Sequence, residues 1–109
     1  MAVAYKNARQ AIGTSYTTAY TCPAATTALV LLAQVANVDG ANAADVSAQW
    51  LDSSNTNTAT RLMELLTIAA KNGINIIGGP LILEAGDAIQ FKASAASRLE
   101  VTLSIREES

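Results

Sequence analysis

Hydrophobic and polar residues alternate along much of this chain, most clearly near its C-terminal end. Four apolar residues there are separated by polar ones: Leu99, Val101, Leu103 and Ile105. Successive side chains of a β-strand point to opposite faces, so this pattern predicts a half-buried strand with one face in water. The same alternation predicts strands at residues 46–50 and 89–93.

Two further segments are expected to be strands for other reasons. Residues 14–21 are rich in Thr and Tyr, which favour β-structure. Residues 28–38 are apolar on both faces until Gln34 and Asn37. A continuous apolar run of this kind indicates a central strand that is covered on both sides.

Turn-forming residues separate these segments roughly every 8 to 15 residues, the spacing of a β-sandwich or barrel. They occur at residues 37–40, 52–58, 78–80 and 84–87. We therefore expect an all-β fold: a single β-sandwich of about seven to nine strands, immunoglobulin-like or jelly-roll-like. Residues 14–109 would form this domain, and residues 1–13 an N-terminal arm or an edge strand.

Residues 59–72 fit two structures. Leu62, Leu65, Leu66 and Ala69 have the spacing of one helix face, and Gly73 would suit the end of a helix. The strand alternative places Leu62, Glu64, Leu66 and Ile68 on one face and Arg61, Met63, Leu65 and Thr67 on the other. The neighbouring strands favour β-structure here, because a lone helix would leave two all-β halves unpaired.

Composition argues against several functions. The 109 residues carry seven basic and nine acidic side chains, a net charge of −2, and the basic residues form no cluster. Nucleic-acid binding needs clustered Lys and Arg, so we expect none. Half of the residues are hydrophobic and only 15% are charged. This balance indicates a chain that hides much of its surface, in part against partner subunits.

No residue is well suited to catalysis, and we expect no enzymatic activity and no cofactor. The chain has no histidine, the usual acid or base near neutral pH. Its single cysteine, Cys22, is expected to be a small buried hydrophobic residue. Glu84 and Asp87 flank a tight turn and are expected to point into water, where Asp87 can accept bonds from neighbouring backbone amides.

No metal site is expected either. Asn37, Asp39, Asn42 and Asp45 form the cluster most like a calcium loop, since calcium prefers oxygen ligands. The loop lacks further carboxylates and a bidentate Glu at suitable spacing, so a solvated hairpin turn is the better interpretation. Trp50, on an alternating strand, is expected to be the largest core residue, with a subunit contact as the alternative.

The order of several segments resembles small virion proteins of tailed bacteriophages. These segments are residues 16–27 (YTTAYTCPAATT), 35–40 (VANVDG), 46–50 (VSAQW), 81–90 (LILEAGDAIQ), 93–96 (ASAA) and 100–104 (EVTLS). They cover most of the chain from Thr14 to Ser104. The resemblance implies a β-sandwich that assembles in many copies on a phage particle, with no catalytic residues to carry over.

We therefore expect a bacteriophage virion structural protein, most specifically a capsid decoration (cement) protein. Its expected partners are the major capsid protein and further copies of itself, with a trimer favoured. The alternatives are a tail component, such as a tube, adaptor or fibre-attachment domain, and a carbohydrate-binding module. Five residues are expected at interfaces because of their place in the N-terminal arm or polar loops: Tyr5, Lys6, Arg9, Asp39 and Asn55.

Localisation follows from this assignment. We expect the protein to be made in the host cytoplasm and to end in the virion. Its N-terminal residues lack the apolar stretch of a signal peptide. The longest apolar run, residues 28–33, is too short to cross a bilayer as a helix, so no membrane association is expected.

Overall fold

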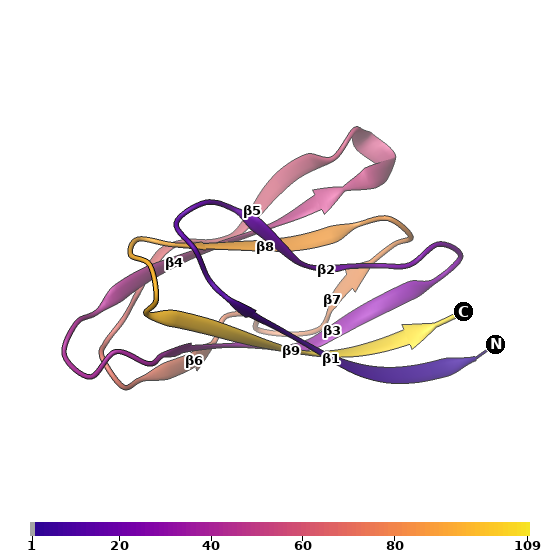
Figure 1. Cartoon of the computed structure of the whole chain (residues 1–109). Coiled ribbons are helices and arrows are strands. Elements are labelled where there is room, and N and C mark those ends of the chain that lie inside the picture. The colour runs from indigo at the N-terminus through magenta and orange to yellow at the C-terminus, as the bar shows by residue number, and fades with distance from the viewer. Residues whose placement is uncertain (1) are drawn as a thin grey trace.

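Nine strands and one short 3₁₀ helix make up residues 2–109, the part of the chain that the computed structural model describes (Figure 1). In chain order they are β1 (Val3–Ala11), β2 (Thr17–Thr21), β3 (Thr27–Asn37), β4 (Ala44–Asp52), η1 (Ser53–Asn55), β5 (Thr58–Ile68), β6 (Gly73–Asn75), β7 (Leu81–Leu83), β8 (Ala88–Ala93) and β9 (Leu99–Glu108). No helix among these residues is long and apolar enough to span a membrane.

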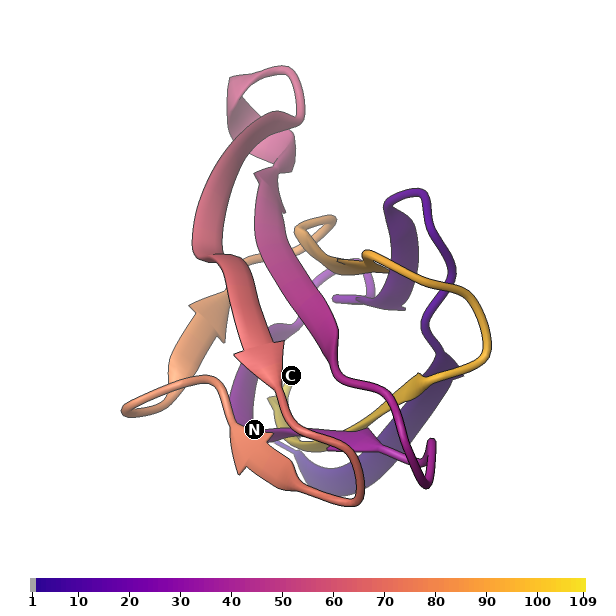
Figure 2. The same ribbon diagram turned by 90° about the vertical axis from the view of Figure 1, so that its left-hand side faces the viewer.

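The strands form two antiparallel sheets that pack as a sandwich, which confirms the expected fold class (Figure 2). Sheet A has the order β1-β9-β3-β6, with β7 pairing beside β6 on the same edge of β3. Sheet B has the order β2-β8-β4-β5. The first and last strands are neighbours, and the chain crosses repeatedly between the sheets. Of the two expected topologies, this is the jelly roll.

The alternating segments form the core as predicted. Their inward-facing side chains are almost completely buried, among them Ile89, Phe91, Leu99, Val101, Leu103 and Ile105. Cys22 is buried in the same core, which confirms its expected role as a small hydrophobic residue. Burial raises the pKa of the Cys22 thiol, so the thiol stays protonated and unreactive.

The ambiguous segment is strand β5, and β-bulges explain its helix-like spacing. Two register shifts interrupt the pairing of β4 with β5, and Leu65 has a positive φ of 51°. A bulge inserts an extra residue and breaks the period of two. As a result Leu62, Met63 and Leu66 all pack against the core, whereas Leu65 is exposed.

Trp50 is only half-buried, so the expectation that it is the largest core residue is wrong. It packs against the edge of the core, and Phe91 is the largest fully buried side chain. Trp50 lies two residues before the end of β4. There the β4–β5 hairpin extends past the body of the sandwich, which leaves less of the opposite sheet to cover the indole (Figure 1).

Candidate functional site

The outer face of β3 is apolar and uncovered. Val30 points into the core, whereas Leu31 is 44% exposed on the opposite face. A register shift between Val30 and Leu32 against β9 makes Leu31 the extra residue of a bulge. Leu31 and Leu32 therefore both lie outside. The expectation that both faces of this strand are covered is wrong within the chain itself, because sheet B covers one face only.

Apolar side chains from three strands of sheet A, β1, β3 and β7, gather on this face. Tyr5 of β1, Arg106 of β9, Leu29 of β3 and Ile82 of β7 are register partners in one row across sheet A. Tyr5 is 72% exposed and Ile82 is 61% exposed. Tyr5 and Leu31 also line one hollow of the surface. We call Tyr5, Leu29, Leu31 and Ile82 the apolar patch.

The only charge in this row is held close to an opposite one. Arg106 Nε lies 3.1 Å from Glu108 Oε2, the carboxylate two residues further along the same face of β9. The Arg106 Nε–H is nevertheless directed at no acceptor. The row thus has little net charge, which suits a contact with another protein.

Sheet B has the opposite character on its outer face. A chain of side-chain hydrogen bonds crosses all four strands there, from Thr18 through Gln90 and Gln49 to Arg61. Gln49 is only 7% exposed, and the nearby Ser47 is fully buried beneath its neighbours. The four side chains of this network satisfy one another, so this part of the face needs no partner to cover it.

Tyr16 lies beside this network and is covered by two cations. The Arg61 guanidinium carbon is 5.1 Å and the Lys92 Nζ is 4.9 Å from the centre of the Tyr16 ring. Both distances are within the range of cation–π attraction. The ring is therefore not available as a flat platform for a ligand.

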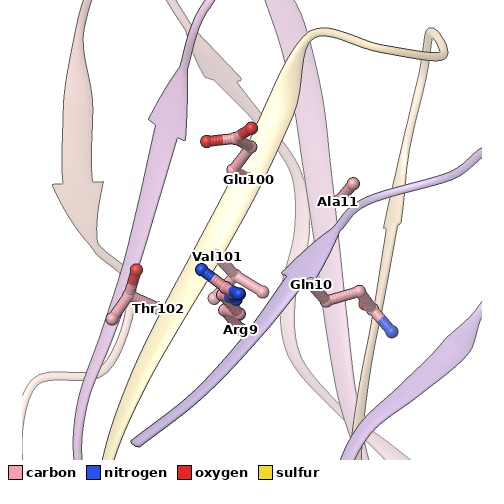
Figure 3. A pocket seen from close by; sticks show the side chains of 6 residues that line it. All are labelled: Arg9, Gln10, Ala11, Glu100, Val101 and Thr102. Carbon is pink, nitrogen blue, oxygen red and sulfur yellow. The ribbon is translucent and has the colours of Figure 1, made fainter.

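A pocket opens between β1 and β9, at the end of sheet A away from the apolar patch (Figure 3). Arg9 and Thr102 are register partners there, as are Ala11 and Glu100. Arg9 makes no ion pair within residues 2–109. The pocket thus presents an unpaired guanidinium, but the polar side chains of Gln10, Glu100 and Thr102 do not converge with it on one point.

Lys6 points the other way, into the gap between the sheets. Its Nζ lies 3.0 Å from Glu107 Oε1, and the Tyr20 hydroxyl donates to Glu107 Oε2. The Tyr20 hydrogen bond and then the Lys6 ammonium lower the pKa of Glu107. Burial and the bond to Glu107 raise the pKa of Tyr20. The three side chains join β1, β9 and β2 and hold the open edge of the sandwich together.

The five expected interface residues do not form one surface. Tyr5 and Arg9 lie on the outer face of β1, whereas Lys6 faces inward. Asp39 lies in the β3–β4 turn, where its Oδ1 accepts from the backbone amides of Ala41 and Asn42. These bonds lower the pKa of Asp39. Asn55 lies in η1, at the opposite end of β4.

The polar side chains of the oxygen-rich turn bond to groups of the protein. Asp45 Oδ1 accepts from Thr67 Oγ1 on β5 instead of joining Asp39. Asn37 is buried, and its Nδ2 donates to the carbonyls of Asn42 and Ile68. These side chains therefore shape the turn, and their oxygens do not converge on a common point.

A different group of carboxylates was not foreseen. Asp52, Glu84 and Asp87 lie within 4.8 Å of one another, the closest such grouping in residues 2–109. Asp87 is 1% exposed, so the expectation that it points into water is wrong. Its Oδ1 accepts from the Ser53 amide and its Oδ2 from the Glu84 amide, as expected of a turn-forming Asp. Since both oxygens are engaged, the cluster acts as a structural clasp.

The sequence carries a signal for the apolar patch that alternation alone misses. An alternating strand would place polar residues at Leu29, Leu31 and Ile82, yet residues 28–33 and 81–83 are unbroken apolar runs. Such runs indicate burial on both faces. Sheet B covers one face of these runs, and the apolar residues on the other face form the apolar patch.

Comparisons with known proteins bear on the fold. No protein-family model matches the sequence, and no curated protein does either. A chain from a structure of Bacillus endospore appendages, described as a novel family of disulfide-linked pili, is similar in fold, with a TM-score of 0.54. The likeness covers 96% of this chain and 85% of that chain at 14% sequence identity. At that identity the likeness concerns the all-β fold alone.

Proposed function

We propose that this protein is a structural subunit of a tailed-bacteriophage virion that decorates the outside of the capsid shell. The observation that supports this role is the apolar patch on sheet A, an uncovered apolar surface on an otherwise well-packed domain. Exposed apolar surface of this kind marks protein contacts. Decoration would let many weakly bound copies clamp neighbouring shell subunits against internal pressure.

The patch has the geometry that such a contact requires. It lies on the face of a sheet, so its side chains are carried by paired strands and need little ordering on binding. Its aromatic member, Tyr5, is the type of residue that dominates interface energies. Arg106, at the centre of the row, is paired with Glu108 and so adds little net charge to the surface.

A carbohydrate-binding role has less support. Sugar platforms need exposed aromatic rings on one face. Here Tyr16 is covered by cations, Tyr20 is bonded to Glu107 between the sheets, and Trp50 is half-buried. Tyr5 is left alone on its face, next to leucines and not to a second ring.

A filament or tail subunit is the second candidate, and the fold likeness to a pilus subunit favours it. Copies of this chain would then have to join without disulfides between exposed thiols. Cys22 is the only cysteine, and it is buried. Assembly would depend on noncovalent surfaces such as the apolar patch.

The test is binding to shells. Purified protein is mixed with genome-free heads of the tailed phage that carries this gene, and the bound fraction is measured by co-sedimentation. We expect saturable binding. Leu31→Thr and Ile82→Thr should each weaken it at least tenfold, because each removes apolar surface from the patch while keeping a residue that favours β-structure. Thr18→Ala, on the outer face of sheet B, is the matched control and should bind like the parent.

Two results would overturn the shell assignment. One is no binding to heads at any concentration tested. The other is binding that the patch variants leave unchanged. Rings or filaments of the purified protein in negative-stain electron microscopy, together with no head binding, would favour the second candidate.

A further inference from the structure

Strand β1 has one edge without a partner. It is the outermost strand of sheet A and pairs on its other side with β9 (Figure 2). That pairing runs without a register shift from Val3 to Ala11. The strand contains no proline and no bulge, the features that usually protect an edge from pairing with another chain.

The backbone groups on the free edge can be identified. Ala2 and Ser109 exchange both of their N–H to C=O bonds, at 2.7 and 2.9 Å. Bonded and non-bonded pairs alternate in an antiparallel ladder. Every second residue from Val3 onward therefore directs its N–H and C=O away from β9: Val3, Tyr5, Asn7, Arg9 and Ala11.

The other sheet edges are poorer templates. The pairing of β5 with β4 shifts twice, and Leu65 has a positive φ, so its edge is irregular. Strand β2 spans only five residues, and two of its carbonyls, those of Thr17 and Thr18, already accept from Gln10 Nε2. Strands β6 and β7 span three residues each. Only β1 offers a long, regular and open edge.

We propose that two copies of this chain pair through β1, antiparallel and about a two-fold axis at Asn7. Strand β1 has nine residues, with Asn7 at its centre. In this register Asn7 faces Asn7 of the second copy, and all nine residues find a partner. The five outward-directed residues would each form a hydrogen-bonded pair, and the two A sheets would become one continuous sheet.

The charges of β1 favour this register over the register shifted by one residue. Tyr5 lies opposite Arg9 of the second copy, an aromatic ring beside a guanidinium that has no ion pair of its own. Lys6 lies opposite Ala8 of the second copy. A two-fold axis at Lys6 would instead place the two Lys6 side chains face to face and leave Gln10 and Ala11 unpaired.

Lys6 does not prevent the pairing. An inward-pointing charge on an edge strand normally discourages association. Here the Lys6 ammonium is already neutralised by Glu107 of the same chain, 3.0 Å away. The ion pair can stay intact when the second copy docks. The pairing goes beyond the proposed function, since it does not depend on the particle to which the protein belongs.

The first test is the solution mass. Size-exclusion chromatography with light scattering should give twice the 11.3 kDa of one chain, rather than the trimer expected from sequence. Asn7→Pro should shift the mass to that of one chain, because it removes the central outward N–H and no bond to β9. Circular dichroism checks that this variant folds. A monomeric or trimeric parent, or a dimer that survives Asn7→Pro, would overturn the proposal.

The second test fixes the register by cysteine cross-linking and does not rely on the proline variant. Under mild oxidation Asn7→Cys should form a disulfide-linked dimer, since Cα atoms of a directly opposed pair lie within disulfide range. Tyr5→Cys and Arg9→Cys should each cross-link poorly alone and well when mixed, and the buried Cys22 should not take part. Equal cross-linking of Tyr5→Cys alone and in the mixture would overturn the register. Leu31→Thr and Ile82→Thr test the proposed function separately, because these residues lie on β3 and β7 and not on β1. Both variants should weaken head binding and leave the solution mass of the dimer unchanged.

Discussion

Gln49 Nε2 donates to Gln90 Oε1 across 2.7 Å, joining the two central strands of sheet B on their outer face. The bond is the middle link of the chain from Thr18 to Arg61. Each amide donates on one side and accepts on the other, so both amides are satisfied within the sheet. Sheet A has no such network around Leu31 and Ile82. The difference between the two outer faces is the physical basis for placing the partner on sheet A.

Replacing Gln49 with Ala should destabilise the fold by about 1–3 kcal/mol, because it removes one hydrogen bond between neutral groups and one from a charged guanidinium. The change removes the acceptor of Arg61 Nη1 and the donor to Gln90 at once. Urea unfolding followed by Trp50 fluorescence measures it. Thr18→Ala, at the exposed end of the same chain, is the control and should change stability by no more than about 0.5 kcal/mol. Equal losses of stability for the two variants would contradict the greater contribution assigned to the buried Gln49.

Stability should fall in acid because of Glu107. Its pKa is lowered in the folded protein, first by the Tyr20 hydroxyl and then by Lys6. A carboxyl group with a lowered folded pKa adds stability above its unfolded value of about 4.3, and this is lost as pH falls through the folded value. Urea midpoints measured from pH 7 to pH 3 should therefore drop in the acid range.

Glu107→Gln is the comparison for this pH dependence. The variant should be less stable than the parent at pH 7, because it loses the charge that pairs with Lys6. Its midpoint should depend less on pH, so that the two proteins converge toward pH 3. Parallel curves over the whole range would contradict the role assigned to Glu107.

The sequence predicts strands best where apolar and polar residues alternate regularly. In β8, and in β9 as far as Ile105, every second residue is apolar, and each of these side chains is buried. The topology did not follow from the pattern, because alternation gives each strand two faces and does not state which strands are neighbours. The choice between immunoglobulin-like and jelly-roll order needed the pairing of β1 with β9.

The failures occur where pairing departs from regularity. The bulge at Leu31 depends on how β3 meets β9, so no local pattern reveals that Leu31 and Leu32 share a face. The bulges of β5 likewise imitate a helical repeat. Asp87 looked solvated because its partner Ser53 lies 34 positions away in sequence and meets it only through the fold. The apolar patch combines side chains from three strands, and its position is therefore a tertiary property.

Two aromatic truncations should separate core from edge. Phe91→Ala should cost about 3–5 kcal/mol, the usual range for a fully buried aromatic ring. Trp50→Ala should cost clearly less, since the half-buried indole leaves a smaller cavity. Chemical unfolding followed by circular dichroism suits both variants, because it does not depend on the tryptophan. A larger loss of stability for Trp50→Ala than for Phe91→Ala would contradict the placement of Phe91 in the core and of Trp50 at its edge.

The turn before β8 should be among the least tolerant positions in the chain. Gly86 has a φ of +87°, and a Cβ there would lie 2.8 Å from Ser53 Oγ. A β-branched residue is strained at positive φ, by about 1–3 kcal/mol for the backbone alone, and the contact would also displace Ser53 from Asp87. Gly86→Val should therefore lower the urea midpoint strongly, and Gly86→Ala less. Gly78→Val is the matched control, because a Cβ at Gly78 meets nothing within 4 Å and φ there is not positive. A midpoint for Gly86→Val equal to that of Gly78→Val would show that neither the positive φ nor the approach of Ser53 constrains the turn.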